Sequence, residues 1–193
     1  LAVETVQEFM RDNQNQIKDD PRRMLLEAYR EASARIHHKS TFESPELMGM
    51  GTTMVAFLAV EDWAFIANVG DSRAYLMRGP HLWQLTEDHS LINEQVRAGV
   101  IPEEEAPHMI GRNVITRSVG FEREVAADLI ERKMEGNELY VMCSDGLSTM
   151  VPNNRIAEIC KKGQLRENAQ KLIAEAKRAG GDDNVSVILI RPG

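Results

Sequence analysis

The order in which hydrophobic periodicity changes along the chain is the feature that most limits its fold. Residues 1–12 and 21–38 carry apolar side chains at spacings of three and four, the pattern of amphipathic helices. Residues 50–85 instead alternate β-branched and aromatic residues with short turns, which predicts closely spaced antiparallel strands. Helical patterns return at 152–161 and 165–179 before a last expected strand. Segregated helices and strands favour an α+β fold over alternating βαβ units.

The middle of the chain has a weaker pattern. We predict a short helix at residues 90–98, an irregular stretch at 99–120, and a β-hairpin formed by 124–133 and 138–143. A chain of 193 residues is long enough to bury one sizeable core. We therefore expect a single domain, residues 1–193, with the stretch 99–120 as an excursion from it.

Composition limits the partners and the setting. The chain has 23 basic and 30 acidic residues, a formal charge of −7, and no long basic stripe, so a nucleic-acid partner is disfavoured. With only two cysteines, Cys143 and Cys160, a reducing, cytoplasmic setting is the simpler expectation. No segment has the uninterrupted apolar length of a membrane span, so we expect a soluble protein without a membrane partner.

Three aspartates, Asp71, Asp145 and Asp183, lie in short loops next to apolar runs that predict buried strands. These runs are residues 64–69, 138–143 and 185–190. If the last strand is antiparallel to the other two, its beginning lies beside their ends and the carboxylates converge. Carboxylate oxygens suit magnesium, manganese or calcium. Each loop taken alone is also explained as an ordinary turn, because aspartate and glycine favour turns.

Short sequence motifs ("words") around these aspartates indicate a particular protein family. Six occur in order: Gly51-Thr52-Thr53, Asn68-Val69-Gly70-Asp71-Ser72-Arg73-Ala74-Tyr75, Thr86-Glu87-Asp88-His89-Ser90, Ile115-Thr116-Arg117-Ser118-Val119-Gly120, Cys143-Ser144-Asp145-Gly146-Leu147 and Asp183-Asn184-Val185-Ser186-Val187. In these words the chain resembles the metal-dependent protein phosphatase family, the type 2C serine/threonine phosphatases, in their bacterial form. The resemblance implies a four-layer α-β-β-α sandwich, in which helices flank two antiparallel sheets.

The same resemblance implies roles for residues in these words. Asp145 and Asp183 would bind the second metal of a binuclear centre, and Asp71 with Asp145 would hold a third, weaker ion. Asn184 would orient the Asp183 loop, and Gly146 would let the backbone pass close to the metals. The expected ions are two, or three, of Mn²⁺ or Mg²⁺. They would support hydrolysis of phosphoserine or phosphothreonine on proteins through a metal-activated water.

Residues 99–120 resemble the flap beside the active site of the family. His108, Arg112 and Arg117 are candidates for substrate contact there, with solvation of a surface as the alternative for each. The implied substrates are proteins phosphorylated by a serine/threonine kinase.

The chain departs from the family pattern at its beginning. The family's opening strands and its Asp-Gly-Met-Gly-Gly-His segment, whose aspartate bridges both catalytic metals, have no counterpart, and Leu1-Ala2-Val3-Glu4 resembles the helix that comes after them. We therefore expect incomplete sheets, or a dimer or strand swap that covers the gap. The competing hypothesis is a non-catalytic phosphatase fold that binds phosphoproteins or regulates another protein.

Overall fold

The computed structural model describes residues 1–106, 109, 111 and 113–192. Their contacts divide the chain into two compact units. The first comprises Leu1–Asp71 and Asp88–Glu131, and the second comprises Ser72–Glu87 and Arg132–Gly193. This division into contact units does not test the single-domain expectation, which stays a prediction.

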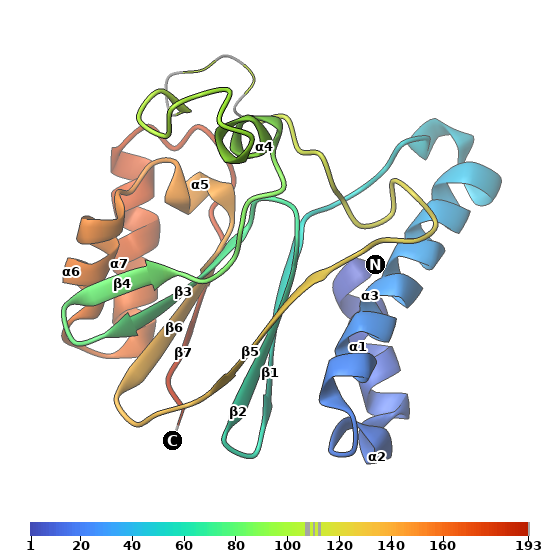
Figure 1. Cartoon of the computed structure of the whole chain (residues 1–193), viewed down its shortest axis with the longest axis horizontal. Helices are drawn as coiled ribbons and strands as arrows, with labels where there is room; N and C mark the ends of the chain where they lie inside the picture. Colours follow the sequence, from blue (N-terminus) through green and yellow to red (C-terminus); the bar gives the residue numbers. More distant parts are fainter. Residues whose placement is uncertain (107–108, 110, 112, 193) are drawn as a thin grey trace. The chain divides into compact units, whose positions relative to one another are not determined.

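The first unit combines helices with a three-stranded sheet of order β1-β2-β5 (Figure 1). Its strands are β1 (Met54–Val60), β2 (Trp63–Val69) and the greater part of β5 (Asp128–Lys133), whose last residues, Arg132 and Lys133, belong to the second unit. Strand β1 pairs antiparallel with β2. Its helices are α1 (Ala2–Asp12), α2 (Gln14–Ile17), α3 (Pro21–His38) and α4 (Leu91–Arg97), with a π-helical segment (Lys39–Glu43) and a 3₁₀ turn (Pro45–Leu47) after α3.

Helix α3 packs against the sheet of the first unit and shares a hydrophobic core with it. The Asp20 carboxylate accepts a hydrogen bond from the Arg23 amide at 3.0 Å, which caps the helix, and Pro21 occupies its first turn. The apolar face expected from the sequence is buried. Within it, the Tyr29 hydroxyl donates to the Ala67 carbonyl of β2 at 2.8 Å, so α3 is joined to the sheet by a buried hydrogen bond as well as by packing.

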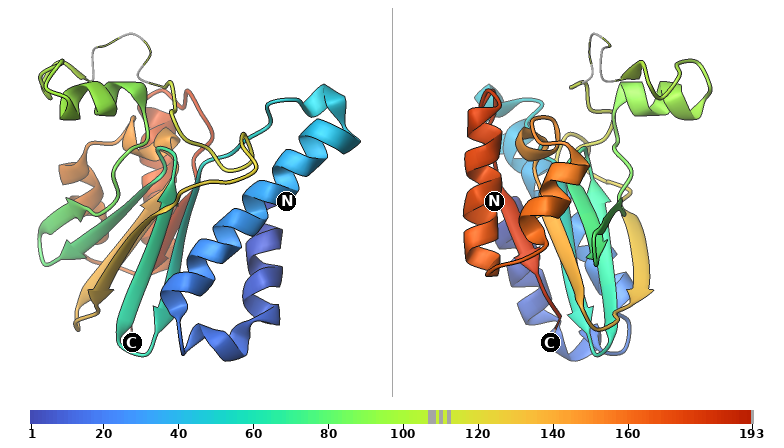
Figure 2. Two further views of the ribbon diagram at one scale, coloured as in Figure 1. Left: turned by 45° about the vertical axis from the view of Figure 1, so that its right-hand side comes forward. Right: turned by 90° about the vertical axis from the view of Figure 1, so that its left-hand side faces the viewer.

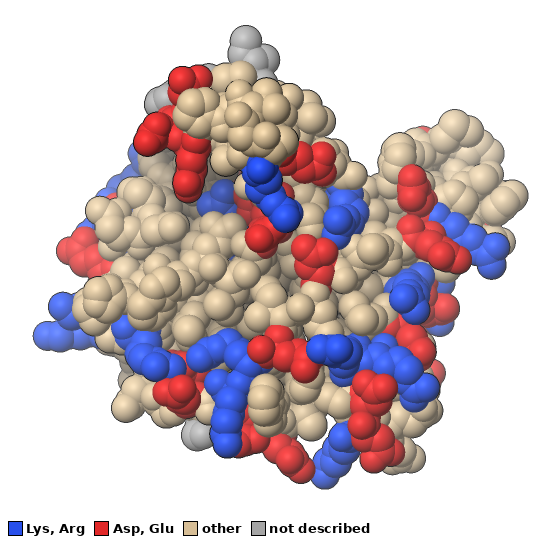
Figure 3. All heavy atoms as spheres, in the orientation of Figure 1, with Lys and Arg blue, Asp and Glu red and all other residues tan. Residues whose placement is uncertain are grey.

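Charged residues of both signs share the surface. In the first unit, Arg35 of α3 forms ion pairs with Glu31 at 2.7 Å and with Glu8 of α1 at 2.8 Å. On the face drawn in Figure 3, basic and acidic side chains are interspersed over the lower part, and a group of acidic side chains lies at the upper left. Such exposed pairs contribute little stability each, so burial of the apolar face of α3 dominates this packing.

The second unit contains a four-stranded antiparallel sheet of order β4-β3-β6-β7. Its strands are β3 (Arg73–Arg78), β4 (His81–Gln84), β6 (Glu138–Cys143) and β7 (Val187–Ile190), and its helices are α5 (Asp145–Ser148), α6 (Asn153–Cys160) and α7 (Leu165–Arg178). Figure 2 shows α7 running alongside β7. Alternate residues of β6 share one core with a residue from each helix: Leu139, Val141 and Cys143 with Leu147, Ile156 and Leu172.

The strand pairing corrects two predictions made from the sequence. The hairpin expected from 124–133 and 138–143 is wrong, because β5 lies beside β2 whereas β6 lies between β3 and β7. The closely spaced antiparallel strands expected over 50–85, as in a meander, form, but they are divided between two sheets, since β2 and β3 belong to different sheets. All six residues of β6 are buried, and such a strand needs a neighbour on each side, which local turn chemistry does not reveal.

A buried carboxylate begins β6. The Glu138 side chain has no exposed surface and accepts hydrogen bonds from Arg132 at 2.8 Å, from the Tyr140 hydroxyl at 3.0 Å and from the Glu135 amide at 3.0 Å. Arg78 adds a further bond at 2.6 Å. Burial alone would raise the pKa of Glu138, but these bonds outweigh it and lower the pKa to about 2.

We expect Glu138→Gln to destabilise the protein at pH 7 by about 3 kcal/mol, the value of a pKa lowered from 4.5 to about 2. Because the folded pKa lies below the unfolded one, this stabilisation is complete above about pH 4.5 and disappears as the pH falls toward 2. Urea unfolding at pH 7 and pH 3 measures the difference. Glu135→Gln is the control, since Glu135 pairs with Arg78 but is 63% exposed. An equal loss in both variants would contradict the expectation.

Candidate metal centre

The Asp145 and Asp183 loops meet at one edge of the four-stranded sheet. There β6 ends beside the beginning of β7, with Cys143 paired to Val187, so the antiparallel arrangement expected for these two strands is confirmed. Hydrogen bonds of Ser144 join, or fasten, the two loops. Its hydroxyl donates to the Asn184 carbonyl at 3.0 Å and accepts from the Ser186 amide at 3.0 Å, and its own amide donates to the Ser186 carbonyl at 3.1 Å.

The absence of a side chain at Gly146 allows this close approach. A Cβ atom at Gly146 would lie 2.4 Å from the Asn184 carbonyl oxygen and 3.0 Å from its carbon, distances that a rigid backbone does not tolerate. The family resemblance implies that Gly146 lets the backbone pass close to the metals. In this structure, the close contact at Gly146 is with the neighbouring loop. Asn184 in turn donates its amide proton to the Asp183 carboxylate at 2.6 Å.

Asp71 is not one of the residues in these two fastened loops. By its contacts it belongs to the first unit, and two residues later the chain begins β3, where Arg73 pairs with Cys143. Among the residues that the structure describes, no group of three or more His, Cys, Asp or Glu side chains could hold a metal ion. The ligand set Asp71, Asp145 and Asp183 therefore stays a prediction.

The donor chemistry of the two fastened loops fits a hard divalent cation. Asp145 is half-buried and Asp183 is exposed, and both are carboxylates on adjoining loops. Magnesium usually keeps several waters and binds proteins through one or two carboxylates. The carboxylates on these two loops are thus of the chemical kind that such an ion binds.

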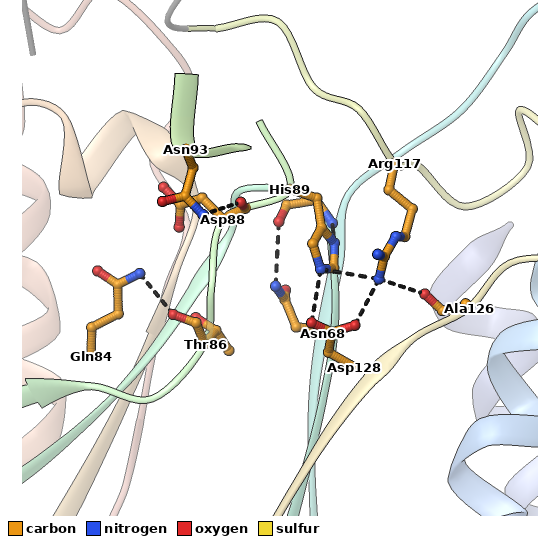
Figure 4. A network of polar contacts seen from close by, with 10 residues as sticks. Asn68, Gln84, Thr86, Asp88, His89, Asn93, Arg117, Ala126 and Asp128 are labelled. Atoms are coloured by element: carbon orange, nitrogen blue, oxygen red, sulfur yellow. Dashed lines mark hydrogen bonds and ion pairs between the residues drawn. The ribbon is translucent and has the colours of Figure 1, made fainter. Parts of the chain in front are cut away.

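A second polar network lies in the first unit and includes Arg117 (Figure 4). Arg117 donates to the Asp128 carboxylate at 2.7 Å and to the Ala126 carbonyl at 2.9 Å, and the His89 ring lies 3.1 Å from the same carboxylate. Partial burial alone would raise the pKa of Asp128, but the bonds from His89 and Arg117 lower it below its usual value. Arg117 is thus engaged within the chain, and its role in substrate contact stays a prediction.

The other two candidates for substrate contact, His108 and Arg112, lie outside the described residues. Conversely, the sequence patterns gave no role to His89, Asp128 or the Ser144 hydroxyl. His89 and Ser144 each occur in one of the six short words, which is the signal that could have found them. Asp128 has no such signal.

Comparison with known proteins identifies the family. The family model described as "Protein phosphatase 2C" matches residues 2–97. The serine/threonine phosphatase stp of Listeria monocytogenes is 42% identical over 146 residues, which is 75% of this chain and 58% of that protein. A putative protein phosphatase 2C-type from Streptococcus pyogenes is 40% identical over 177 residues, covering 91% of this chain and 70% of that protein.

Comparison with solved structures leads to the same family. The Mycobacterium tuberculosis serine/threonine phosphatase PstP/Ppp matches with a TM-score of 0.89 at 33% identity, over 97% of this chain and 80% of that one. The catalytic domain of PstP in complex with 2 manganese ions matches with a TM-score of 0.79 at 32% identity, over 96% and 80%. The expected fold class, two antiparallel sheets flanked by helices, is confirmed. The chain therefore belongs to the protein phosphatase 2C family.

The chain spans 58% of the length of the Listeria relative that it matches. In the described part of the chain, the helices are too short or too polar to cross a membrane.

Proposed function

We propose that the protein hydrolyses phosphoserine and phosphothreonine on proteins that a serine/threonine kinase has phosphorylated. The observation that carries this proposal is the pair of carboxylate loops, Asp145 and Asp183, fastened by Ser144 in a chain of the protein phosphatase 2C family. Relatives that are 42% identical are named serine/threonine phosphatases, which supports the same substrate class here.

In this proposal the residues of the chain bind a divalent cation and orient its ligands. Asp145 and Asp183 supply anionic oxygens, Asn184 holds the Asp183 carboxylate through its amide, and Gly146 keeps the loops close together. A bound divalent cation would supply positive charge to the phosphoryl oxygens and lower the pKa of water. Manganese is the first ion to test, since the PstP catalytic domain was solved with two manganese ions, and magnesium is the second.

The proposed setting is the bacterial cytoplasm, where such a phosphatase would serve signalling. Support comes from the two cysteines, Cys143 and Cys160, which are both buried and not joined in a disulfide. Burial raises the pKa of the Cys160 thiol to about 11, which keeps it protonated and unreactive at neutral pH.

The direct test is release of phosphate from a phosphothreonine peptide by the purified protein with Mn²⁺, with and without excess EDTA. We expect turnover that requires the metal. The matched control is the same peptide with unphosphorylated threonine, compared with the phosphopeptide in calorimetric binding. Specific binding of the phosphopeptide without turnover would contradict the proposal and favour the non-catalytic alternative.

A further inference from the structure

His89 bonds to both polar groups of the Gly70 backbone. The His89 amide donates to the Gly70 carbonyl at 3.0 Å, and the Gly70 amide donates to Nδ1 of the His89 ring at 3.0 Å. The Asn68 side chain adds a second donor to the same carbonyl at 3.3 Å. His89 is buried, with 7% of its surface exposed. One histidine thus holds the residue that directly precedes Asp71.

The surroundings of the ring determine its tautomer. Nδ1 accepts a hydrogen bond from Gly70, so it carries no proton, and the proton of a neutral ring lies on Nε2. Nε2 is 3.1 Å from an Asp128 carboxylate oxygen, which accepts that proton's hydrogen bond. Arg117 also lies 3.1 Å from Nε2, but its donors are directed at better acceptors, the Asp128 carboxylate and the Ala126 carbonyl (Figure 4).

Gly70 cannot easily change its conformation. Its φ angle of +102° lies in a region that favours glycine, and a Cβ atom there would lie 2.4 Å from Cγ2 of Thr53. Thr53 therefore packs against one side of the turn, and His89 forms hydrogen bonds with the backbone of Gly70. Asp71 directly follows this turn, so the bonds from His89 to Gly70 also restrain the backbone that leads into Asp71.

We propose that His89, kept in its Nε2–H tautomer by Asp128, is a positioning residue that fixes the Gly70–Asp71 turn for binding of a divalent cation. The proposal rests on the proposed function, and it also takes from the sequence analysis the prediction that Asp71 is a cation ligand. It assigns His89 and Asp128 a role that the sequence did not indicate.

The tautomer is tested first, by nitrogen NMR of the ring in the purified protein without metal. The expected result is an unprotonated Nδ1 and a protonated Nε2 at neutral pH. In Asp128→Ala, the Nδ1–H tautomer should gain population, because the acceptor of the Nε2 proton is gone. A wild-type ring protonated at Nδ1 would overturn the proposal.

Two substitutions of His89 then separate its contacts. In His89→Asn the amide oxygen takes the position of Nδ1 and can accept from Gly70, whereas in His89→Gln the amide nitrogen reaches the position of Nε2 and keeps only the bond to Asp128. Binding of Mn²⁺ is read from paramagnetic broadening of the Gly70 and Asp71 amide signals. We expect His89→Gln to weaken binding about 10- to 100-fold, and His89→Asn to stay within about threefold of wild type.

The outcomes separate this proposal from the proposed function. Equal Mn²⁺ binding in the two variants and the wild type overturns the positioning role, whether or not the protein hydrolyses phosphopeptides. Weakened binding in His89→Gln with no hydrolysis by the wild type overturns only the proposed activity. If His89→Gln fails to fold, Asp128→Ala replaces it, since that side chain is 47% exposed, and unchanged Mn²⁺ broadening at Asp71 then counts against the proposal.

Discussion

Replacing Asp145 by alanine is expected to reduce manganese-dependent hydrolysis of a phosphothreonine peptide by at least about 100-fold. Asp145 begins helix α5 directly after Ser144, whose hydroxyl bonds to the Asp183 loop, so the backbone at Asp145 is held next to that loop. Without the Asp145 carboxylate, Asp183 alone is a poor ligand for a hydrated cation. Steady-state kinetics over a range of Mn²⁺ concentrations measures the loss.

The control for this substitution is Asp182→Ala. It removes the same charge from the residue next to Asp183, but nothing in the resemblance or the geometry assigns Asp182 to a cation. Its turnover should stay within about twofold of wild type, because one exposed charge changes the local potential only slightly. Equal losses in Asp145→Ala and Asp182→Ala would indicate general electrostatics rather than a ligand.

Gly146→Ala is expected to have the second large effect. Its added Cβ would lie 2.4 Å from the Asn184 carbonyl oxygen, which belongs to backbone and cannot rotate away like a side chain. The two loops must separate, at a cost of about 1–3 kcal/mol in the free energy of unfolding. Separation also weakens the Ser144 hydrogen bonds, so Mn²⁺-dependent turnover should fall with stability.

Gly136→Ala provides the matched control, since no heavy atom lies within 4 Å of the Cβ position at Gly136. Urea unfolding of the two variants compares the same chemical change with and without a steric contact. The account is contradicted if Gly146→Ala and Gly136→Ala are equally stable and equally active.

Local patterns predicted the longer helices α1, α3, α4, α6 and α7, but not the single-turn helices α2 and α5. The bounds of α3 agree with the sequence analysis because two independent local signals coincide, an apolar stripe and the Asp20-Pro21 start. Strand pairing was not predictable in the same way. The segment between β5 and β6 looks like a hairpin turn, with Asn137 at φ +67°, yet the strands it joins belong to different sheets. Partner choice depends on burial across the whole chain rather than on the turn.

In the candidate site, too, the local features were predicted and the long-range contacts were not. The loops that carry Asp145 and Asp183 were predicted, because carboxylates at strand ends leave a sequence signal. The groups that hold the loops of the candidate site were not. Ser144, which joins the Asp145 and Asp183 loops, bonds to a residue 40 positions away. His89, which holds the Gly70–Asp71 turn, bonds to Gly70, 19 positions away, and to Asp128, 39 positions away. Hydrogen bonds over such separations have no sequence period, so only the folded structure reveals them.

Titration of the protein with Mn²⁺, monitored by broadening of the backbone amide signals, tests whether the Asp145 and Asp183 loops bind one cation together. We predict that residues 144–147 and 183–186 broaden together at the lowest Mn²⁺ concentrations, and that Asp145→Ala abolishes this joint broadening. Broadening that begins at another acidic segment, such as Glu103-Glu104-Glu105, and leaves these two loops unaffected would contradict the account.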